Sequence, residues 1–351
     1  MTDTSMDAVA PRGIEVDQVS DWLRTHLSGA SAPFRFDLVT AGGSCLTYRV
    51  TDSRGHTFAL RRPPVGRRVG NAHDVGREWK ILSALSGGGV GVPVPEPLAE
   101  CRDDAVTGAP FYVMDFVDGT ILRTAADAAD WTPEQCTRAS DALIDTQVAM
   151  HAVDVDAVGL GDLARTRTGY VERQLSRWRR QLEAADTREV PLLYDLHARL
   201  AARVPAEVDA GRIAHGDYRF DNVVLGEDLS VAAILDWELC TLGDPVADFC
   251  WSLLYWADPG DPVTALTDPP TLAPGFVRRD EIAERYAKRS GRSLDAYDYY
   301  MAFSWWKQAC IVEGVLARAK HGASGGAPIG DLSAIADRVD AYLEVADSLL
   351  S

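Results

Sequence analysis

Three oxygen-bearing side chains near the middle of the chain have the order and spacing that phosphoryl transfer from MgATP requires. Asp217 lies in the segment His-Gly-Asp-Tyr-Arg-Phe-Asp-Asn, Asn222 is the last residue of that segment, and Asp236 opens the triplet Asp-Trp-Glu. In such a site one Asp accepts the proton of the attacking hydroxyl, while an Asn amide oxygen and a second carboxylate hold Mg²⁺. The spacing therefore predicts Asp217 as the catalytic base and Asn222 and Asp236 as the ligands of Mg²⁺.

The residues between Asn222 and Asp236 predict a β-hairpin that brings these two side chains together. Residues 223–225 and 231–235 form two short apolar runs, and the polar turn 226–228 separates them. Runs of this length around such a turn are typical of a tight antiparallel hairpin. We therefore expect Asn222 and Asp236 to lie side by side at the open end of the hairpin.

Each of these motifs also has a simpler interpretation. His-Gly-Asp at 215–217 is a common surface turn, and Asp221 and Asn222 are common helix caps. Any one triplet alone would favour that interpretation. The joint spacing of Asp217, Asn222 and Asp236 around a predicted hairpin favours a phosphotransferase site.

The same motifs carry a resemblance to a known family. Protein kinases have H-R-D-x-x-x-x-N and D-F-G in this arrangement, whereas Gly216 replaces the Arg here and Trp237 and Glu238 replace the Phe and Gly. These departures are typical of the aminoglycoside phosphotransferase family, which the chain resembles from Gly42 to at least Trp256. Within that family, the chain is most similar to the kinase-like domains fused to acyl-CoA dehydrogenases.

Upstream of the motif, the apolar pattern predicts a leading helix and a small antiparallel sheet. The segments are 16–27 for the helix and 34–38, 46–50 and 58–60 for the first three strands. The turn between the first two strands contains Gly42, Gly43 and Ser44. The family resemblance implies that this turn folds over the ATP phosphates, since glycine lets backbone N–H groups approach anionic oxygens closely. An ordinary hairpin turn is the other interpretation of a Gly-Gly pair.

Arg61 ends the third predicted strand, where kinases place the Lys that binds the α- and β-phosphates. The resemblance implies that Arg61 has this role, because the Leu-Arg-Arg-Pro-Pro run around it is common in the same branch. A helix is predicted from residue 74, and Glu78 within it is the best candidate for the carboxylate that pairs with Arg61. A surface position is the alternative for Glu78. Solvated strand-end positions are equally favoured for the neighbouring Arg62, Arg67 and Arg68.

A further strand pair is expected near 98–102 and 111–116, and the segment 111–119 leads into the hinge between two lobes. Resemblance to the family implies that Met114 lies at the back of the adenine pocket. It also implies that the backbones of Asp115 and Val117 hydrogen-bond the base. Simple core packing is the alternative for Met114.

Helical patterns dominate the rest of the chain. Thr-Pro-Glu-Gln from Thr132 has the form of a capping box and predicts a helix through His151, which we expect to pack rather than to catalyse. Two Arg-rich helices are expected over 170–203. The arginines in question are Arg173, Arg177, Arg179 and Arg180. We favour a solvent-exposed helix face for them, and the alternative is that they face an anionic substrate.

Two features follow the second Asp of the motif. The family resemblance implies that Asp248 orders the catalytic loop, whereas by position alone it is an ordinary residue of a helix's first turn. The aromatic residues between 297 and 306 are expected mostly to pack in the core, although the floor of an acceptor pocket is an alternative.

Composition and charge limit the classes of partner. The 351 residues are 46% apolar and carry a formal charge of −17. A negative surface opposes sequence-independent binding to nucleic acid or to anionic membranes, and no stretch is long and apolar enough for a membrane span. No secretory signal is visible, and the six scattered cysteines form no C-x-x-C pair. We therefore expect a cytoplasmic protein with reduced thiols, of unknown oligomeric state.

Together these patterns predict an α+β, two-lobed protein-kinase-like fold. Residues 1–117 would form a nucleotide-binding lobe with a leading helix and a small antiparallel sheet, and residues 118–351 a mainly helical catalytic and substrate-binding lobe. ATP and Mg²⁺ are the expected cofactors, bound in the cleft between the lobes, and the reaction transfers the γ-phosphoryl group to a hydroxyl of a small molecule.

Several alternatives stay open at this point. An inactive nucleotide-binding module is one, and a protein kinase is less favoured because no activation segment ending in Ala-Pro-Glu follows Asp236. The family allows an aminoglycoside or another hydroxylated antibiotic, a choline-like or sugar metabolite, or a hydroxyacyl-CoA as the acceptor. The arginines favour an anionic acceptor and the net charge favours a cationic one, so the sequence does not decide.

Overall fold

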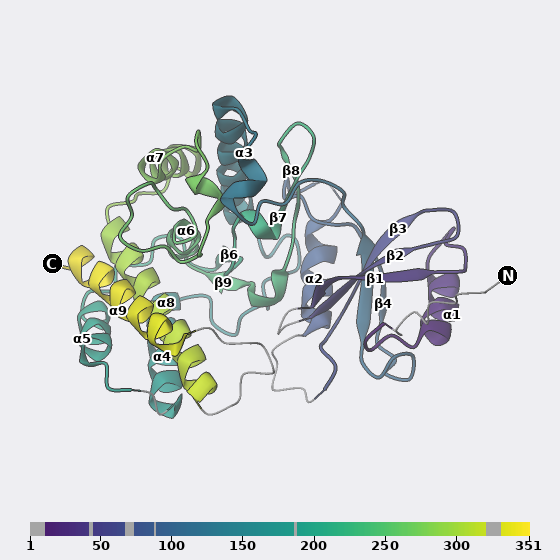
Figure 1. The fold of residues 1–351 in the computed structure, drawn as a ribbon, viewed down its shortest axis with the longest axis horizontal. Coiled ribbons are helices and arrows are strands. Elements are labelled where there is room, and N and C mark those ends of the chain that lie inside the picture. Colours follow the sequence, from purple (N-terminus) through teal and green to yellow (C-terminus); the bar gives the residue numbers. More distant parts are fainter. Residues whose placement is uncertain (1–10, 42–44, 67–73, 88, 186–187, 321–330) are drawn as a thin grey trace. The chain divides into compact units, whose positions relative to one another are not determined.

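The computed structural model describes residues 11–41, 45–66, 74–87, 89–185, 188–320 and 331–351 (Figure 1). The chain divides into two units, Met1–Asp118 and Gly119–Ser351. Strands dominate the first unit and helices the second, so the predicted α+β class is confirmed. None of the helices in the described segments is long and apolar enough to cross a membrane.

The first unit is built on a five-stranded antiparallel sheet in the order β1-β2-β3-β5-β4. The strands are β1 Arg35–Ala41, β2 Leu46–Thr51, β3 Thr57–Arg62, β4 Pro97–Cys101 and β5 Phe111–Asp115. Successive side chains of a strand point to opposite faces. Phe111 accordingly contacts Trp22 of helix α1 (Val16–His26), and Tyr112 bonds Glu78 of helix α2 (Val75–Leu85). The two helices therefore cover opposite faces of this sheet (Figure 1).

The face under α1 forms the apolar core of the first unit. Val19 and Leu23 of α1 are fully buried and belong to one cluster with Tyr48, Leu60 and Phe111 of the sheet. On the other face, α2 begins at Asp74, whose carboxylate accepts a hydrogen bond from the Arg77 N–H. The two helices that the spacing of apolar residues predicts, at 16–27 and from residue 74, are therefore both present.

In the second unit, the described residues form seven α-helices and two small pairs of antiparallel strands. Its helices are α3 Pro133–Ala152, α4 Tyr170–Ala185, α5 Pro191–Ala201, α6 Pro245–Leu253, α7 Arg279–Ser290, α8 Tyr297–Lys320 and α9 Leu332–Leu349. Its strands are β6 Arg212–Ala214, β7 Val223–Leu225, β8 Val231–Ile234 and β9 Thr241–Gly243, paired as β6–β9 and β7–β8. Short 3₁₀ turns lie at 125–128, 220–222, 237–239 and 270–272.

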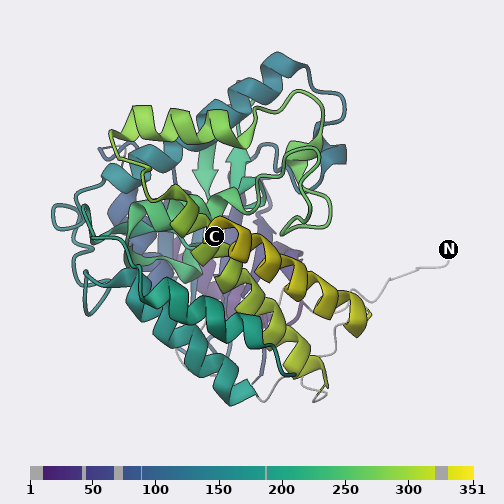
Figure 2. The ribbon, with the colours of Figure 1, turned by 90° about the vertical axis from the view of Figure 1, so that its left-hand side faces the viewer.

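Helix α8 is the central helix of this unit. Helices α4, α5, α6 and α9 pack against it, and Figure 2 shows α4 and α5 lying beside α8 and α9. Most aromatic residues of α8 are core residues, as expected: Tyr299, Tyr300, Phe303, Trp305 and Trp306 are buried, whereas Tyr297 is half-buried. Helix α3 packs against α7 and begins with the predicted capping box, in which the Gln135 N–H donates to the Thr132 hydroxyl and the Thr132 N–H to the Gln135 amide oxygen.

All six cysteines are buried and unbonded to one another. The expectation of packed, reduced thiols is therefore consistent with their surroundings.

Candidate active site

The predicted base, Asp217, lies in a loop that follows β6. Asp248 of α6 holds this loop through hydrogen bonds to its backbone. The Asp248 carboxylate accepts hydrogen bonds from the backbone N–H groups of His215 at 3.1 Å and Gly216 at 2.8 Å. His215 in turn contacts the Leu235 carbonyl oxygen through Nε2 at 2.9 Å. The loop is thus tied both to α6 and to the end of the hairpin.

Gly216 shows why this chain lacks the kinase arginine at that position. Its backbone φ is +83°, in the left-handed region, where a residue with a Cβ pays a steric cost in free energy. A Cβ here would also lie 3.1 Å from the carbonyl oxygen of Leu239. The glycine is therefore a requirement of this loop's path.

Asp248 is the centre of a fully buried polar network. His151 of α3 contacts the Asp248 carboxylate through Nε2 at 3.1 Å and the Tyr286 hydroxyl through Nδ1 at 2.8 Å. Burial alone would raise the pKa of Asp248, but its bonds to His151 and to the Gly216 N–H hold that pKa below the usual value. His151 thus packs and orients Asp248, in line with its expected non-catalytic position.

Asn222 is oriented by Asp217. Its amide nitrogen donates to the Asp217 carbonyl oxygen and to the Asp217 carboxylate, both at 2.8 Å. Because both N–H groups are used, the amide oxygen is the atom left to accept or to ligate. This orientation suits a residue that presents an oxygen to Mg²⁺.

The predicted hairpin is present and carries Asp236 next to Asn222. Val223 pairs with Ile234, and the Leu235 N–H donates to the Asn222 carbonyl oxygen at 2.8 Å. The residue after Leu235 is Asp236, which has φ +60° and ψ +64°. Few residues other than glycine adopt this left-handed conformation, although Asp tolerates it better than most.

Trp237 stabilises the turn that places Asp236. Its ring is 1% exposed, lies edge-on to His215 with 4.8 Å between ring centroids, and donates from Nε1 to the Ile234 carbonyl oxygen at 3.0 Å. A buried indole anchored at both ends fixes the backbone at this corner. The Trp that replaces the kinase Phe is therefore part of the support of the second Asp.

Two further side chains contact the Asp217 carboxylate, and the sequence analysis missed both. Arg219 lies 3.2 Å from Asp217 Oδ1 and 2.9 Å from Asp221 Oδ1 through its Nε, and its guanidinium lies 4.8 Å from the centre of the Tyr255 ring. Burial and the neighbouring Asp217 carboxylate, to which it hydrogen-bonds, raise the pKa of Tyr255 well above the usual value. Arg219 lies within the segment 215–222, so its closeness to Asp217 could have been predicted from the sequence. Tyr255 lies in no recognised motif, so its contact with Asp217 could not.

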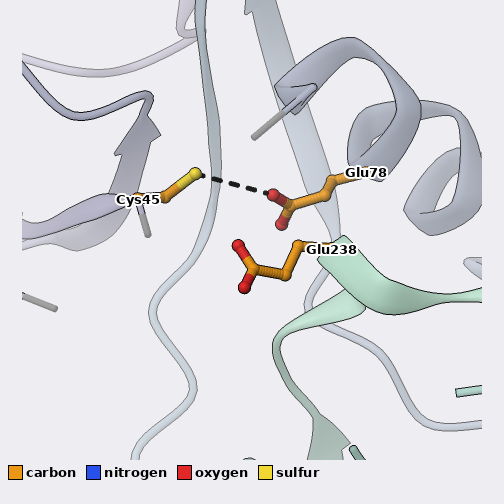
Figure 3. A group of neighbouring side chains, drawn as sticks. All are labelled: Cys45, Glu78 and Glu238. Atoms are coloured by element: carbon orange, nitrogen blue, oxygen red, sulfur yellow. Dashed lines mark hydrogen bonds between the residues drawn. The ribbon is translucent and has the colours of Figure 1, made fainter. Parts of the chain in front are cut away.

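In the first unit, the predicted pair of Arg61 and Glu78 is present and buried. Arg61 Nε lies 2.8 Å from Glu78 Oε2, and the two residues are 8% and 1% exposed. Tyr112 donates to the same carboxylate oxygen at 3.0 Å, and the Cys45 thiol is directed at the other oxygen at 3.9 Å (Figure 3). The surface position considered for Glu78 is therefore wrong, because α2 turns this residue onto the sheet.

Arg62 is a buried structural residue, so the solvated position considered for it is wrong too. Its Nη1 donates to the Thr107 carbonyl oxygen at 3.1 Å and the Thr107 hydroxyl at 3.0 Å, and its Nε donates to the Pro63 carbonyl oxygen. The adjacent Arg67 and Arg68 lie outside the described residues. An arginine at a strand end is recognisable from sequence, but its partner 45 residues away is not.

The residues predicted to contact the adenine lie at the end of β5 and just beyond it. Gly42, Gly43 and Ser44 lie outside the described residues. Met114 is 7% exposed on β5, opposite Ala59 of β3. The Asp115 N–H donates to the Glu96 carbonyl oxygen at 2.9 Å, and Val117 is half-buried beyond the strand.

The predicted substrate-facing arginines of α4 fall into two groups. Arg179 pairs with Glu183 and lies over the Tyr194 ring, and Arg180 is exposed, so both belong to a solvated helix face. Arg173 is half-buried, with a buried Nη1 that has no hydrogen-bond partner among the described residues. Arg177 is exposed one turn further along the helix.

Comparison with known proteins shows clear relatives. The model of the phosphotransferase enzyme family matches residues 36–300. Over 311 residues the chain is 32% identical to acyl-CoA dehydrogenase family member 10 of Mus musculus, covering 87% of this chain and 28% of that protein. It is 35% identical over 280 residues to acyl-CoA dehydrogenase family member 11 of Gallus gallus, covering 75% and 34%. The chain thus spans about a third of the length of these relatives.

Solved structures share the architecture. A candidate aminoglycoside phosphotransferase from Ralstonia eutropha JMP134 is 29% identical and has a TM-score of 0.80, with 95% of this chain and 97% of that chain covered. The ADP-bound aminoglycoside phosphotransferase APH(2'')-Ib has a TM-score of 0.58 at 12% identity, covering 96% and 99%. The second likeness is one of fold alone, and the two together confirm the predicted protein-kinase-like architecture.

Proposed function

The chain belongs to the phosphotransferase enzyme family, and from that premise we propose that it transfers the γ-phosphoryl group of MgATP to a hydroxyl of a small molecule. The observation that carries the proposal is the pair of hydrogen bonds that the Asn222 amide nitrogen donates to Asp217. These bonds couple the predicted metal ligand to the predicted base. Within the part of the chain that the structure describes, the Asn222 amide oxygen accepts no hydrogen bond, which leaves it for a ligand.

Asp217 is the proposed base and the residue that positions the acceptor hydroxyl. Its carboxylate is held in one orientation by Asn222, Arg219 and Tyr255. A fixed carboxylate can align the hydroxyl for in-line attack and take up its proton as the new P–O bond forms.

Asn222 and Asp236 are the proposed ligands of Mg²⁺. An amide oxygen and a carboxylate are hard oxygen donors, which is the set that Mg²⁺ prefers. The strained backbone of Asp236 supports this assignment, since left-handed non-glycine residues persist where a side chain must point in a particular direction. When bound, the ion would supply positive charge that neutralises the nucleotide phosphates.

Arg61 is proposed to bind the nucleotide phosphates in place of the kinase lysine, with Glu78 holding it in position. Its Nε forms an ion pair with the Glu78 carboxylate, and its Nη1 donates a hydrogen bond to the Thr47 hydroxyl at 3.3 Å. A guanidinium carries five N–H donors in a planar fork, a geometry that suits phosphate oxygens. Gly42, Gly43 and Ser44 are proposed as the phosphate-covering turn, and Met114, Asp115 and Val117 as the adenine contacts.

Two alternatives are less well supported. An inactive nucleotide-binding module requires no base, yet Asp217, Asn222 and Asp236 are all present and mutually oriented. A protein kinase requires an activation segment ending in Ala-Pro-Glu, and none follows Asp236.

A panel of hydroxylated compounds with γ-labelled ATP tests the proposal. Aminoglycosides, choline-like and sugar metabolites, and hydroxyacyl-CoA thioesters should be incubated with the protein and Mg²⁺, and the label followed from ATP into each acceptor. The proposal predicts labelling of at least one acceptor that depends on Mg²⁺. Nucleotide binding without transfer to any acceptor would favour the inactive module.

A further inference from the structure

A buried lysine near the catalytic loop has no role in the reaction described above. Lys307 lies on α8, is only 7% exposed, and places its Nζ 3.6 Å from the centre of the Trp251 ring. No described residue accepts a hydrogen bond from this Nζ. Lysines are almost never fully buried unless they are paired, so the position calls for an explanation.

The geometry connects Lys307 to the predicted base through two aromatic rings. Trp251 lies on α6, three residues after the Asp248 that holds the catalytic loop. Its ring meets Tyr255 edge-on at 6.0 Å between centroids, and the Tyr255 hydroxyl bonds Asp217. Lys307 therefore lies beside the part of the second unit where the acceptor hydroxyl must approach Asp217.

Other donors in the same region also have no acceptor. The indole Nε1 of Trp251 is buried without a hydrogen-bond partner among the described residues, and so is one Nη of Arg173 on α4. Helix α4 packs against α8, and the charge of Arg177 on α4 acts on Lys307. Ammonium, guanidinium and indole groups can only donate, so each of them lacks an acceptor. Because two of the three groups are cations, an anionic acceptor suits them best.

Lys307 carries its charge at neutral pH despite its burial. Burial lowers the pKa of Lys307 to about 8, and the positive charge of Arg177 acts in the same direction. The carboxylates of Asp248 and Asp217 oppose these effects. At pH 7 most of the protein therefore holds a desolvated cation at this position.

We propose that Lys307, with Arg177 near it on α4, binds an anionic group of the phosphoryl acceptor. The acceptor is then a hydroxylated anion, with a carboxylate or a phosphate ester as its charged group. A desolvated ammonium attracts such a group more strongly than a solvated surface lysine does. The inference rests on the proposed function and names the substrate class of the same site, against the cationic acceptor that the net charge of −17 suggests.

Calorimetric titration tests anion binding without requiring turnover. The probes are 3-hydroxybutyrate for a carboxylate, glycerol 3-phosphate for a phosphate ester, and glycerol as the uncharged control. Each is titrated into the wild-type protein, into Lys307→Met, which keeps the chain length but removes the charge, and into Lys307→Arg, which keeps the charge. Lys288→Met, which removes an exposed lysine of α7, is the matched control.

The expected result is that at least one anionic probe binds the wild type and Lys288→Met equally and binds Lys307→Met at least tenfold more weakly. Lys307→Arg should retain part of the affinity, and glycerol should show no dependence on Lys307. No affinity of the wild type for either anion, or equal affinity in Lys307→Met, would overturn the inference. If the anion binds through Lys307 but no acceptor is ever labelled from ATP, the proposed phosphotransferase activity fails while the anion site stands.

Discussion

The amide nitrogen of Asn222 donates to both the backbone carbonyl and the carboxylate of Asp217, each at 2.8 Å. A predicted metal ligand and the predicted base are thus fixed by the same pair of hydrogen bonds. A substitution that removes the hydrogen-bonding group of either side chain releases the other, so the effects of such substitutions should not add.

Asp236→Asn should weaken Mg²⁺-dependent ATP binding with little loss of stability. Asn tolerates the left-handed backbone of this position nearly as well as Asp, but it lacks the charge that holds the ion. At a hundredfold excess over the dissociation constant, MgATP should add about 2.7 kcal/mol to the free energy of unfolding of the wild type. Thermal unfolding with and without MgATP measures this gain. A full gain in Asp236→Asn would rule out Asp236 as a ligand, and Asp228→Asn, on the exposed hairpin turn, serves as control.

Arg61→Ala should weaken binding of ATP more than binding of adenosine, which has no phosphates. Arg61→Lys should retain part of the ATP affinity. Because Arg61→Ala also removes the cation paired with the buried Glu78, it should lower the free energy of unfolding by about 3 kcal/mol.

Arg61→Ala combined with Glu78→Gln separates the two effects. The double variant should recover part of the lost stability, since it no longer buries a carboxylate whose arginine has been removed, but none of the lost ATP affinity. Calorimetric titration and urea unfolding measure the two quantities. Equal losses for ATP and adenosine would show that Arg61 is a structural residue alone.

Asp248→Asn should destabilise the protein at pH 7 by an amount that shrinks in acid. The folded-state pKa of Asp248 is lowered, so the stability it provides is fully present above its unfolded pKa of about 3.9 and is lost as the pH falls through the lower, folded value. Urea unfolding of both proteins at pH 7 and in steps below pH 4 follows the difference. A difference that stays constant into strong acid would mean that the carboxylate charge contributes nothing.

How much of this site the sequence predicts depends on how local each contact is. The Asn222 and Asp236 pair follows from a hairpin whose strands are adjacent in the chain, and Glu78 follows from motif order and helical spacing. Tyr255 lies in the turn after α6 and Lys307 lies on α8, both far along the chain, and no local pattern ties either to Asp217. Such contacts are set by how α6 and α8 pack, which the apolar pattern predicts only as burial.

Lys307→Met should stabilise the protein below pH 8, because the folded state binds the Lys307 proton less tightly than the unfolded state. The pKa of Lys307 falls from 10.5 to about 8 on folding because of burial and of the Arg177 charge, while the carboxylates of Asp248 and Asp217 act in the opposite direction. At pH 7 the lysine is protonated in both states and its burial cost is fully present. After the lost cation–π contact is subtracted, the gain in free energy of unfolding should be about 2 kcal/mol.

The gain from Lys307→Met should fall as the pH rises from about 8 to 10.5, since the folded wild type then releases its proton first and loses the cost. Urea unfolding at pH 7, 9 and 10.5 follows the trend, with Lys288→Met as control. A loss of stability in Lys307→Met at pH 7 would show that the ammonium is a structural requirement of the fold.

Asp217→Asn tests the central claim most directly. The substitution keeps the size of the side chain but removes the base, so transfer of label from γ-labelled ATP to the acceptor should fall by about 10²-fold to 10⁴-fold. The dissociation constant for MgATP, measured by calorimetry on the same samples, should change by less than about threefold. Turnover near that of the wild type in Asp217→Asn would contradict the account, because the chemistry would then not depend on the carboxylate around which the site is built.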